Sequence, residues 1–119
     1  MIEEYQFGKI RVLNKDYYYD VLINQKGEVF RWQRKESHII DLEDLEKALK
    51  SNPKIVIIGT GELGVAKLTE RAKKELEKRE IQLIIDITPK AVKAFNIFAR
   101  EFKEQKRNQG FVGLFHLTC

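Results

Sequence analysis

Residues 54 to 64 read KIVIIGTGELG, a continuous apolar run that leads into three glycines. A short apolar run that ends at glycine is typical of a β-strand buried on both faces of a sheet. Gly59, Gly61 and Gly64 also have the G-x-G-x-x-G spacing of a dinucleotide-binding turn. The stretch therefore predicts a central strand with a candidate ligand site at its end.

Downstream of this turn, the pattern predicts two helices and two more strands. One face of the first helix is marked by Val65, Leu68, Ala72 and Leu76. A second buried strand is expected at residues 81–88, after which Thr88 and Pro89 start the second helix as its N-cap and its first residue. This helix ends in the polar stretch KEQKRNQG, with Gly110 as its stop, before a last strand at residues 111–119.

Upstream of the turn, residues 3–34 predict an antiparallel β-meander. Apolar and polar residues alternate there, and NQKG at residues 24–27 has the composition of a hairpin loop. A short helix is expected from Asp41 to about Lys50. The order of elements is that of an α/β protein, and the length of 119 residues predicts a single domain over residues 1–119.

The composition predicts a soluble, cytoplasmic protein with no membrane partner. No charged-then-apolar leader is recognised at MIEEYQFGKI, and the apolar runs are too short to span a bilayer. Cys119 is the one cysteine, which fits a reducing compartment. Charged residues make up 34% of the chain, mostly Lys and Glu, a balance that is enriched in thermostable proteins.

The net charge of +4 does not indicate a nucleic-acid partner. Residues 1–53 carry nine basic and ten acidic residues, whereas residues 54–119 carry thirteen and eight. Most of the basic residues alternate with Glu on expected helices instead of gathering with aromatic side chains on one face. We therefore interpret them as a solvated surface and expect no nucleic acid to bind.

Two interpretations of the glycine turn are open. A strand before it, a helix after it and Asp86 at the end of the next strand fit a dinucleotide site. The chain is short for the two halves of a dinucleotide fold, and Val65 with Ala66 after Gly64 excludes a P-loop. We favour a structural turn or small-anion site over a dinucleotide site.

Several ordered motifs carry a family resemblance that spans the chain. They are FGKI, YYYDVLI, WQRKESHII, DLEDL, IVIIGTGELG, ITPKAVKAFNIF and FHLTC. Together they resemble the Mth938-domain family, which includes an adipogenesis-associated protein and an assembly factor of mitochondrial complex I. The resemblance implies a three-layer α/β fold with a mixed central sheet and no established catalytic activity. Gln33 departs from the family's usual WWR pattern and leaves any role of an aromatic side chain there in doubt.

The candidate ligand-binding rim combines the glycine turn with polar residues expected nearby. Backbone N–H groups at the turn could cradle an anion, and a loop with His38 could add cations. Each candidate also has a structural interpretation as a tight corner, a solvated loop, a hydrogen-bonded amide or a half-buried imidazole. The rim residues are Arg34, Lys35, Thr60, Gly61, Asn96 and His116.

The function expected first is a non-catalytic protein-binding or assembly module, because no nucleophile, base and orienting group converge in the sequence. The alternative is an enzyme or binding protein for a small anion or nucleotide at the turn between Gly59 and Gly64. No cofactor and no metal are expected; with two histidines and one cysteine, a metal site lacks ligands unless carboxylates join. Another protein is the expected partner, and self-association through the meander's edge strand is compatible with the sequence.

Overall fold

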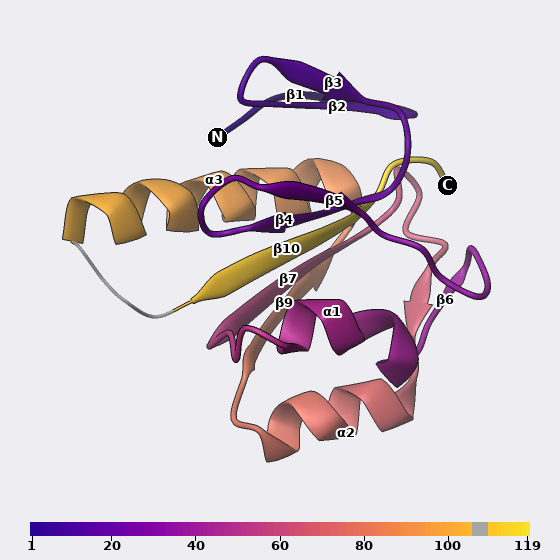
Figure 1. The fold of residues 1–119 in the computed structure, drawn as a ribbon. Coiled ribbons are helices and arrows are strands. Elements are labelled where there is room, and N and C mark those ends of the chain that lie inside the picture. The colour runs from indigo at the N-terminus through magenta and orange to yellow at the C-terminus, as the bar shows by residue number, and fades with distance from the viewer. Residues whose placement is uncertain (106–109) are drawn as a thin grey trace.

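The computed structural model describes residues 1–105 and 110–119 and has three layers (Figure 1). The strands are β1 (Ile2–Gln6), β2 (Lys9–Val12), β3 (Lys15–Tyr17), β4 (Val21–Asn24), β5 (Val29–Arg31), β6 (Ile39–Ile40), β7 (Ile55–Thr60), β8 (Lys67–Leu68), β9 (Gln82–Asp86) and β10 (Phe111–His116). The helices are η1 (Leu42–Leu45), a 3₁₀ turn, and α1 (Glu46–Leu49), α2 (Glu70–Lys78) and α3 (Thr88–Gln105).

A mixed five-stranded sheet forms the middle layer, with the strand order β5-β4-β10-β7-β9. β10 is parallel to β7 and antiparallel to β4, while β9 is parallel to β7 at the edge. The last strand therefore runs in opposite directions relative to its two neighbours. This mixed α/β architecture is the one that the family resemblance implies.

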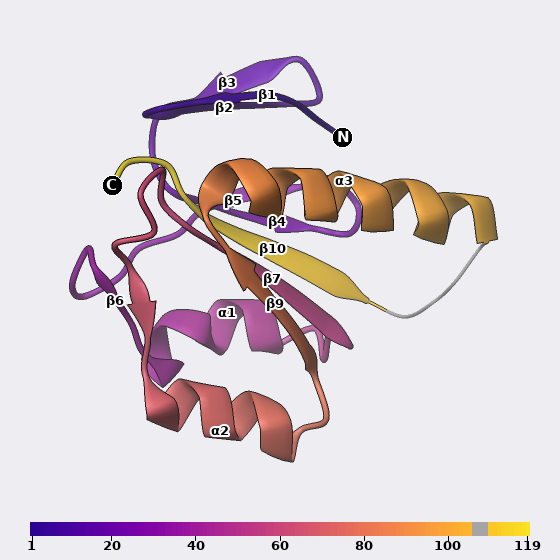
Figure 2. The same cartoon turned by 180° about the vertical axis from the view of Figure 1, so that it is seen from behind.

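The two outer layers enclose separate apolar cores. α3 and the small antiparallel sheet β1-β2-β3 cover one face, where Phe95 and Phe115 are fully buried against Ile10. α1 and α2 cover the other face, where Leu45 and Leu76 pack with strand residues. Figures 1 and 2 show the loops that follow β7 and β10 on one side of the molecule, together with the loop at residues 33–38. We call this side the carboxyl edge of the sheet.

Three expectations from the sequence need correction. The meander is divided, because β1, β2 and β3 form a sheet of their own while the β4-β5 hairpin joins the central sheet. β9 is not buried on both faces; Ile85 is 41% exposed at the edge of the sheet. The first helix after the glycine turn begins only at Glu70, with Thr69 as its N-cap.

The expected end of the last helix lies partly outside the described residues. α3 is described to Gln105, and the structure resumes at Gly110 before β10. Within the described ranges, 1–105 and 110–119, no helix combines the length and the apolar character needed to cross a lipid bilayer.

Candidate functional site

Gly61 lies at the centre of the glycine turn, directly after β7, with a φ of +105° that favours glycine. Its amide donates to Oγ1 of Thr88 at 2.8 Å, and the same hydroxyl donates to the carbonyl of His116 at 2.6 Å. Thr88 is fully buried. Its hydroxyl therefore joins the end of β7 to the end of β10 at the start of α3.

The next amides of the turn are occupied by the residues after β10, which we call the C-terminal segment (117–119). The amide of Glu62 donates to the carbonyl of Thr118 at 2.7 Å, and the amide of Val65 donates to the carbonyl oxygen of Cys119 at 3.0 Å. A Cβ on Gly61 would lie 2.3 Å from the carbonyl carbon of Cys119. The expectation that these N–H groups are free for an anion is therefore wrong.

The turn also lacks the helix that a nucleotide site requires. Residues between Gly64 and the N-cap Thr69 are extended, and they include β8, which pairs with β6. The positive end of the α2 dipole consequently does not point at the turn, so the main electrostatic argument for a phosphate there is lost.

Asp86, which the sequence placed near a ribose, has a local role. One of its carboxylate oxygens accepts from the amide of Ile87 at 2.8 Å, and its carbonyl accepts from the Thr60 hydroxyl at 3.1 Å. The depression next to these residues holds about 360 Å³ and opens to solvent beside Leu63 and Ile85. Its lining is mainly apolar, which does not suit a phosphate.

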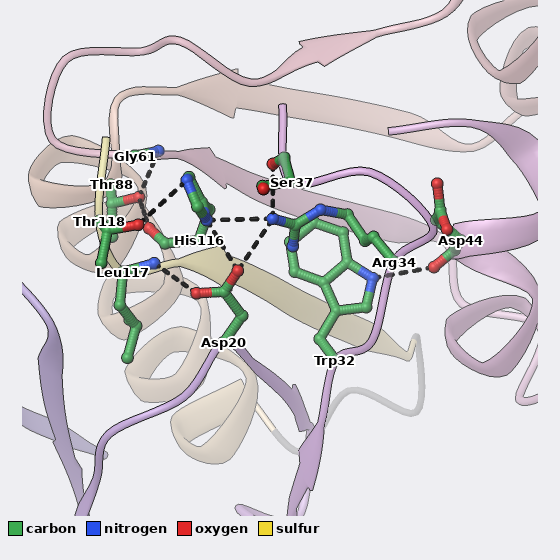
Figure 3. Close-up of polar contacts among 10 residues, drawn as sticks. All are labelled: Asp20, Trp32, Arg34, Ser37, Asp44, Gly61, Thr88, His116, Leu117 and Thr118. Atoms are coloured by element: carbon green, nitrogen blue, oxygen red, sulfur yellow. Dashed lines mark hydrogen bonds and ion pairs between the residues drawn. The ribbon is translucent and has the colours of Figure 1, made fainter. Parts of the chain in front are cut away.

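A buried ion network lies beside the turn (Figure 3). Oδ2 of Asp20 lies 2.9 Å from Nη2 of Arg34 and 2.7 Å from Nδ1 of His116. Its other oxygen accepts from the amide of Leu117 at 2.8 Å, while Nη2 of Arg34 donates to the carbonyl of Ser37 at 2.8 Å. The network thus connects the start of β4, the loop after β5 and the end of β10.

The proton positions in this network follow from the donors. Nη2 of Arg34 and Nδ1 of His116 are 3.0 Å apart, and both face the same oxygen of Asp20. Because a guanidinium can only donate, and an unprotonated Nδ1 would face the carboxylate with its lone pair, we assign a proton to Nδ1. Asp20 therefore accepts from both neighbours.

The electrostatic surroundings keep Asp20 ionised. Burial alone would raise the pKa of Asp20, but the hydrogen bonds from His116 and from the Leu117 amide, with the charges of His116 and Arg34, lower this pKa below its ordinary value. The carboxylate thereby compensates the positive charge of a side chain that is only 3% exposed.

Arg34 has unused hydrogen-bonding capacity on its buried side. The guanidinium stacks on the ring of Trp32 at 4.3 Å, and the indole Nε1 donates to the carbonyl of Asp44 at 2.9 Å. Across the described ranges, neither Nε nor Nη1 of Arg34 has a hydrogen-bond partner, although both are buried. The cation–π contact with the Trp32 ring partly replaces these missing hydrogen bonds.

The other expected rim residues do not join one site. Asn96 accepts from the amide of Ile2 at 2.9 Å and donates to its carbonyl at 2.8 Å, so its amide holds β1 against α3. Lys35 is exposed in the loop after Arg34. The ring of His38 lies edge-on to that of His116, with 6.0 Å between their centroids.

The geometry favours a structural role for the network over catalysis. Nε2 of His116 lies 3.4 Å from Oγ1 of Thr118, and its Nδ1 contacts Asp20, so the imidazole lies between a carboxylate and a hydroxyl. That distance is at the long limit of a hydrogen bond, and the His116 side chain is only 4% exposed, so a substrate does not reach the imidazole. In the part of the chain that the structure describes, no cluster of acidic, His or Cys side chains is placed to hold a metal ion.

Sequence reasoning missed two residues that organise this region, Asp20 and Thr88. Asp20 is a lone carboxylate within the β-forming run YYYDVLI, and such a residue must find a cation when the run is buried. Thr88 was interpreted as a helix N-cap, but its hydroxyl bonds instead to neighbouring strand ends.

Comparison with protein families gives one match over most of the chain. The model of a family described as "Protein of unknown function (DUF498/DUF598)" matches residues 2–105. Among curated proteins, none matches this sequence.

Solved structures share the complete fold. A conserved hypothetical protein from Pyrococcus horikoshii is 26% identical, with a TM-score of 0.80 over 100% of this chain and 99% of its own. The protein MT938 is 23% identical, with a TM-score of 0.77 over 100% of this chain and 98% of its own. A Mth938-like domain of Bordetella pertussis is 16% identical, with a TM-score of 0.71 over 98% of this chain and 85% of its own.

Proposed function

Because this chain belongs to the Mth938-domain family (DUF498), for which no biochemical activity is established, we propose a function from its own surface: a non-catalytic module that binds another protein at the carboxyl edge of its sheet. The single observation that carries the proposal is that a group of large apolar side chains is exposed on the chain segments that gather at this edge (Figure 1). We call this group the apolar rim. It consists of Phe7, Tyr18, Tyr19, Ile39, Leu63 and Val65.

Backbone contacts hold the segments of the apolar rim together. Gly8, next to Phe7, donates its amide to the carbonyl of Leu117 at 2.8 Å. The amide of Val65 donates to Cys119, so Leu63 and Val65 lie beside the same C-terminal segment. The rim is thus a group of loops fixed around the end of β10, on the side where the C label lies in Figure 1.

The remaining rim residues are anchored through the ion network. Tyr18 and Tyr19 directly precede Asp20, whose carboxylate binds the end of β10. Ile39 follows His38, whose ring packs on that of His116, and pairs with Lys67 on β8. The buried charges therefore hold in place the loops that carry the apolar rim. In this proposal the network has a structural role and not a catalytic one.

The character of this surface favours a protein over a small ligand. Leu63 is 76% and Phe7 is 58% exposed, and side chains of this size are seldom left in water in a group. Aromatic residues such as the tyrosines of this rim are enriched at protein interfaces. The nearby glycine turn offers no free amides at Gly61, Glu62 or Val65 for an anion.

Site-specific photo-crosslinking tests this proposal. A benzoylphenylalanine replaces Leu63 in one variant and Leu13 in another, and each purified variant is irradiated in extract of the source organism. Leu13 is a matched control because it is 57% exposed but lies in the turn between β2 and β3. We expect one protein to be crosslinked at position 63 and not at position 13.

The proposal fails if position 63 captures no protein, or if positions 13 and 63 capture the same proteins equally. Either result would mean that the apolar rim has no preferred protein partner.

A further inference from the structure

β9 is an open edge of the central sheet. Figure 2 shows it as the outermost strand, between α3 on one side and α2 on the other, and none of the described elements lies beyond it. Its sequence is QLIID, and Gln82, Ile85 and Asp86 are exposed. It carries no Lys, Arg or Pro, the residues with which edge strands usually prevent pairing.

The free backbone groups of β9 can be assigned to particular residues. The amide of Gln82 donates toward β7, to the carbonyl of Lys54 at 2.9 Å, and the ladder continues in parallel register to Asp86. Because backbone groups alternate along a strand, Leu83 and Ile85 direct their N–H and C=O groups away from β7. These two residues therefore present an unpaired ladder at the edge.

The same five residues are complementary to themselves in the antiparallel direction. A twofold axis at Ile84 places Leu83 opposite Ile85 of a second copy, and each of these residues has outward N–H and C=O groups to exchange. Gln82 then lies opposite Asp86, so that a side-chain amide faces a carboxylate. Each cross-strand pair thus combines two apolar side chains or a hydrogen-bond donor with an acceptor.

We propose that two copies of this chain pair antiparallel through β9, about a twofold axis at Ile84, to form one continuous ten-stranded sheet across the dimer. A partner strand from another kind of protein would need to reproduce this pairing, whereas a second copy supplies it by symmetry.

Side-chain packing on the α2 face supports the same register. Leu83 packs partly against the core under α2, while Ile85, on the same face of the strand, is 41% exposed beside the depression lined by Leu63 and Leu68. Pairing brings Leu83 of the second copy onto Ile85. The most exposed apolar side chain of β9 is thereby covered.

Sedimentation equilibrium of the purified full chain tests the pairing. A strand edge alone is a small interface, so the protein is measured from about 10 µM to about 1 mM, where weak interfaces associate. We expect the apparent mass to rise from that of one chain to that of two. A mass of one chain at every concentration would overturn the proposal.

Two substitutions of exposed apolar side chains locate the interface. Ile85→Lys puts a charge beside the twofold axis of the pairing, whereas Leu13→Lys adds the same charge at a side chain that is 57% exposed in the turn between β2 and β3. We expect Ile85→Lys to weaken dimerisation at least about tenfold and Leu13→Lys to leave it unchanged. Equal effects of the two substitutions would contradict an interface at β9.

Amide hydrogen exchange gives a readout that does not depend on a variant. The amides of Gln82 and Ile84 bond to β7 in the monomer and should be protected at all concentrations, whereas those of Leu83 and Ile85 should become protected only at high concentration. Fast exchange of Leu83 and Ile85 at every concentration would refute the pairing even if the chain associated elsewhere.

Discussion

Asp20 is the residue on which the buried charges of this protein depend. Asp20→Asn leaves the guanidinium of Arg34 without its compensating carboxylate in a buried position, and removal of one partner of such a pair is strongly destabilising. We expect a loss of about 3 kcal/mol in the free energy of unfolding. Urea denaturation followed by the fluorescence of Trp32, the one tryptophan, measures this loss.

Asp16 provides the matched control for this substitution. Its side chain is similarly exposed and pairs with Arg11 at 2.8 Å, but that pair lies on the surface of the small sheet. Asp16→Asn should cost less than about 1 kcal/mol. If the two variants unfold at the same urea concentration, the network around Asp20 does not have the importance that we assign to it.

The lowered pKa of Asp20 also predicts how stability depends on pH. A carboxyl group whose pKa is lower in the folded state contributes stability that is fully present above its unfolded pKa of about 4. This contribution is lost as the pH falls through the folded pKa. Urea midpoints measured between pH 6 and pH 2.5 should fall less steeply for Asp20→Asn than for the unchanged protein, and parallel curves would contradict the assignment.

For the buried ion network, the sequence predicts which residues take part better than it predicts which of them are in contact. Arg34 was recognised as a candidate because it belongs to a polar loop that leaves the meander, and His116 because it lies between Phe115 and Leu117 in the last strand. Their common partner, Asp20, is 96 residues from His116 in the sequence, and the two meet because β4 and β10 become neighbours only through the order of the sheet. A pattern of local spacing cannot supply such a contact.

The sequence indicated that the glycine turn could be a ligand site, whereas in the structure it packs against the C-terminal segment. Gly61→Ala combines a φ of +105° with a Cβ that would lie 2.3 Å from the carbonyl carbon of Cys119, so the C-terminal segment must move. Gly8→Ala is the matched control, since Gly8 has a φ of +81° and open space around the added Cβ. We expect Gly8→Ala to cost about 1–2 kcal/mol and Gly61→Ala to cost more.

Thermal unfolding of the two alanine variants measures the difference. The amide of Val65 should also exchange faster in Gly61→Ala, because its acceptor on Cys119 is displaced. Equal melting temperatures would show that the C-terminal segment is not packed on Gly61.

Two elements show why the helix and strand predictions were incomplete. Val65 and Leu68 fit helical spacing with the residues of α2, but they lie in an extended segment because β8 pairs with β6 across the chain. The local signal was Thr69 followed by Glu70, an N-cap with an acid in the first turn. For β9, an apolar run predicts a strand but does not indicate whether a neighbour lies on each side.

For the molecule as a whole, the occupied amides predict that small anions do not stabilise the protein. A specific ligand at ~100 times its dissociation constant would add roughly 2.7 kcal/mol. We expect nucleotides, phosphate and carboxylates to leave the melting temperature unchanged in a thermal-shift screen. A stabilising anion whose effect disappears in Gly61→Ala would restore the ligand interpretation of the turn.

The three-layer mixed fold was predictable at this scale, because its motifs run through the whole chain and match the family over residues 2–105. The apolar rim was not predictable, since it gathers side chains from four separate segments of the chain around the end of β10. Each of these side chains is an ordinary apolar residue in the sequence.

The most direct test of the central claim is the affinity of the protein captured at position 63 for two variants of this chain. Leu63→Asp places a charge within the apolar rim, whereas Leu13→Asp places it at an exposed leucine outside the rim. If the rim binds the partner, Leu63→Asp raises the dissociation constant at least about tenfold, which is about 1.4 kcal/mol, and Leu13→Asp leaves it unchanged. Equal dissociation constants for the two variants would contradict the account.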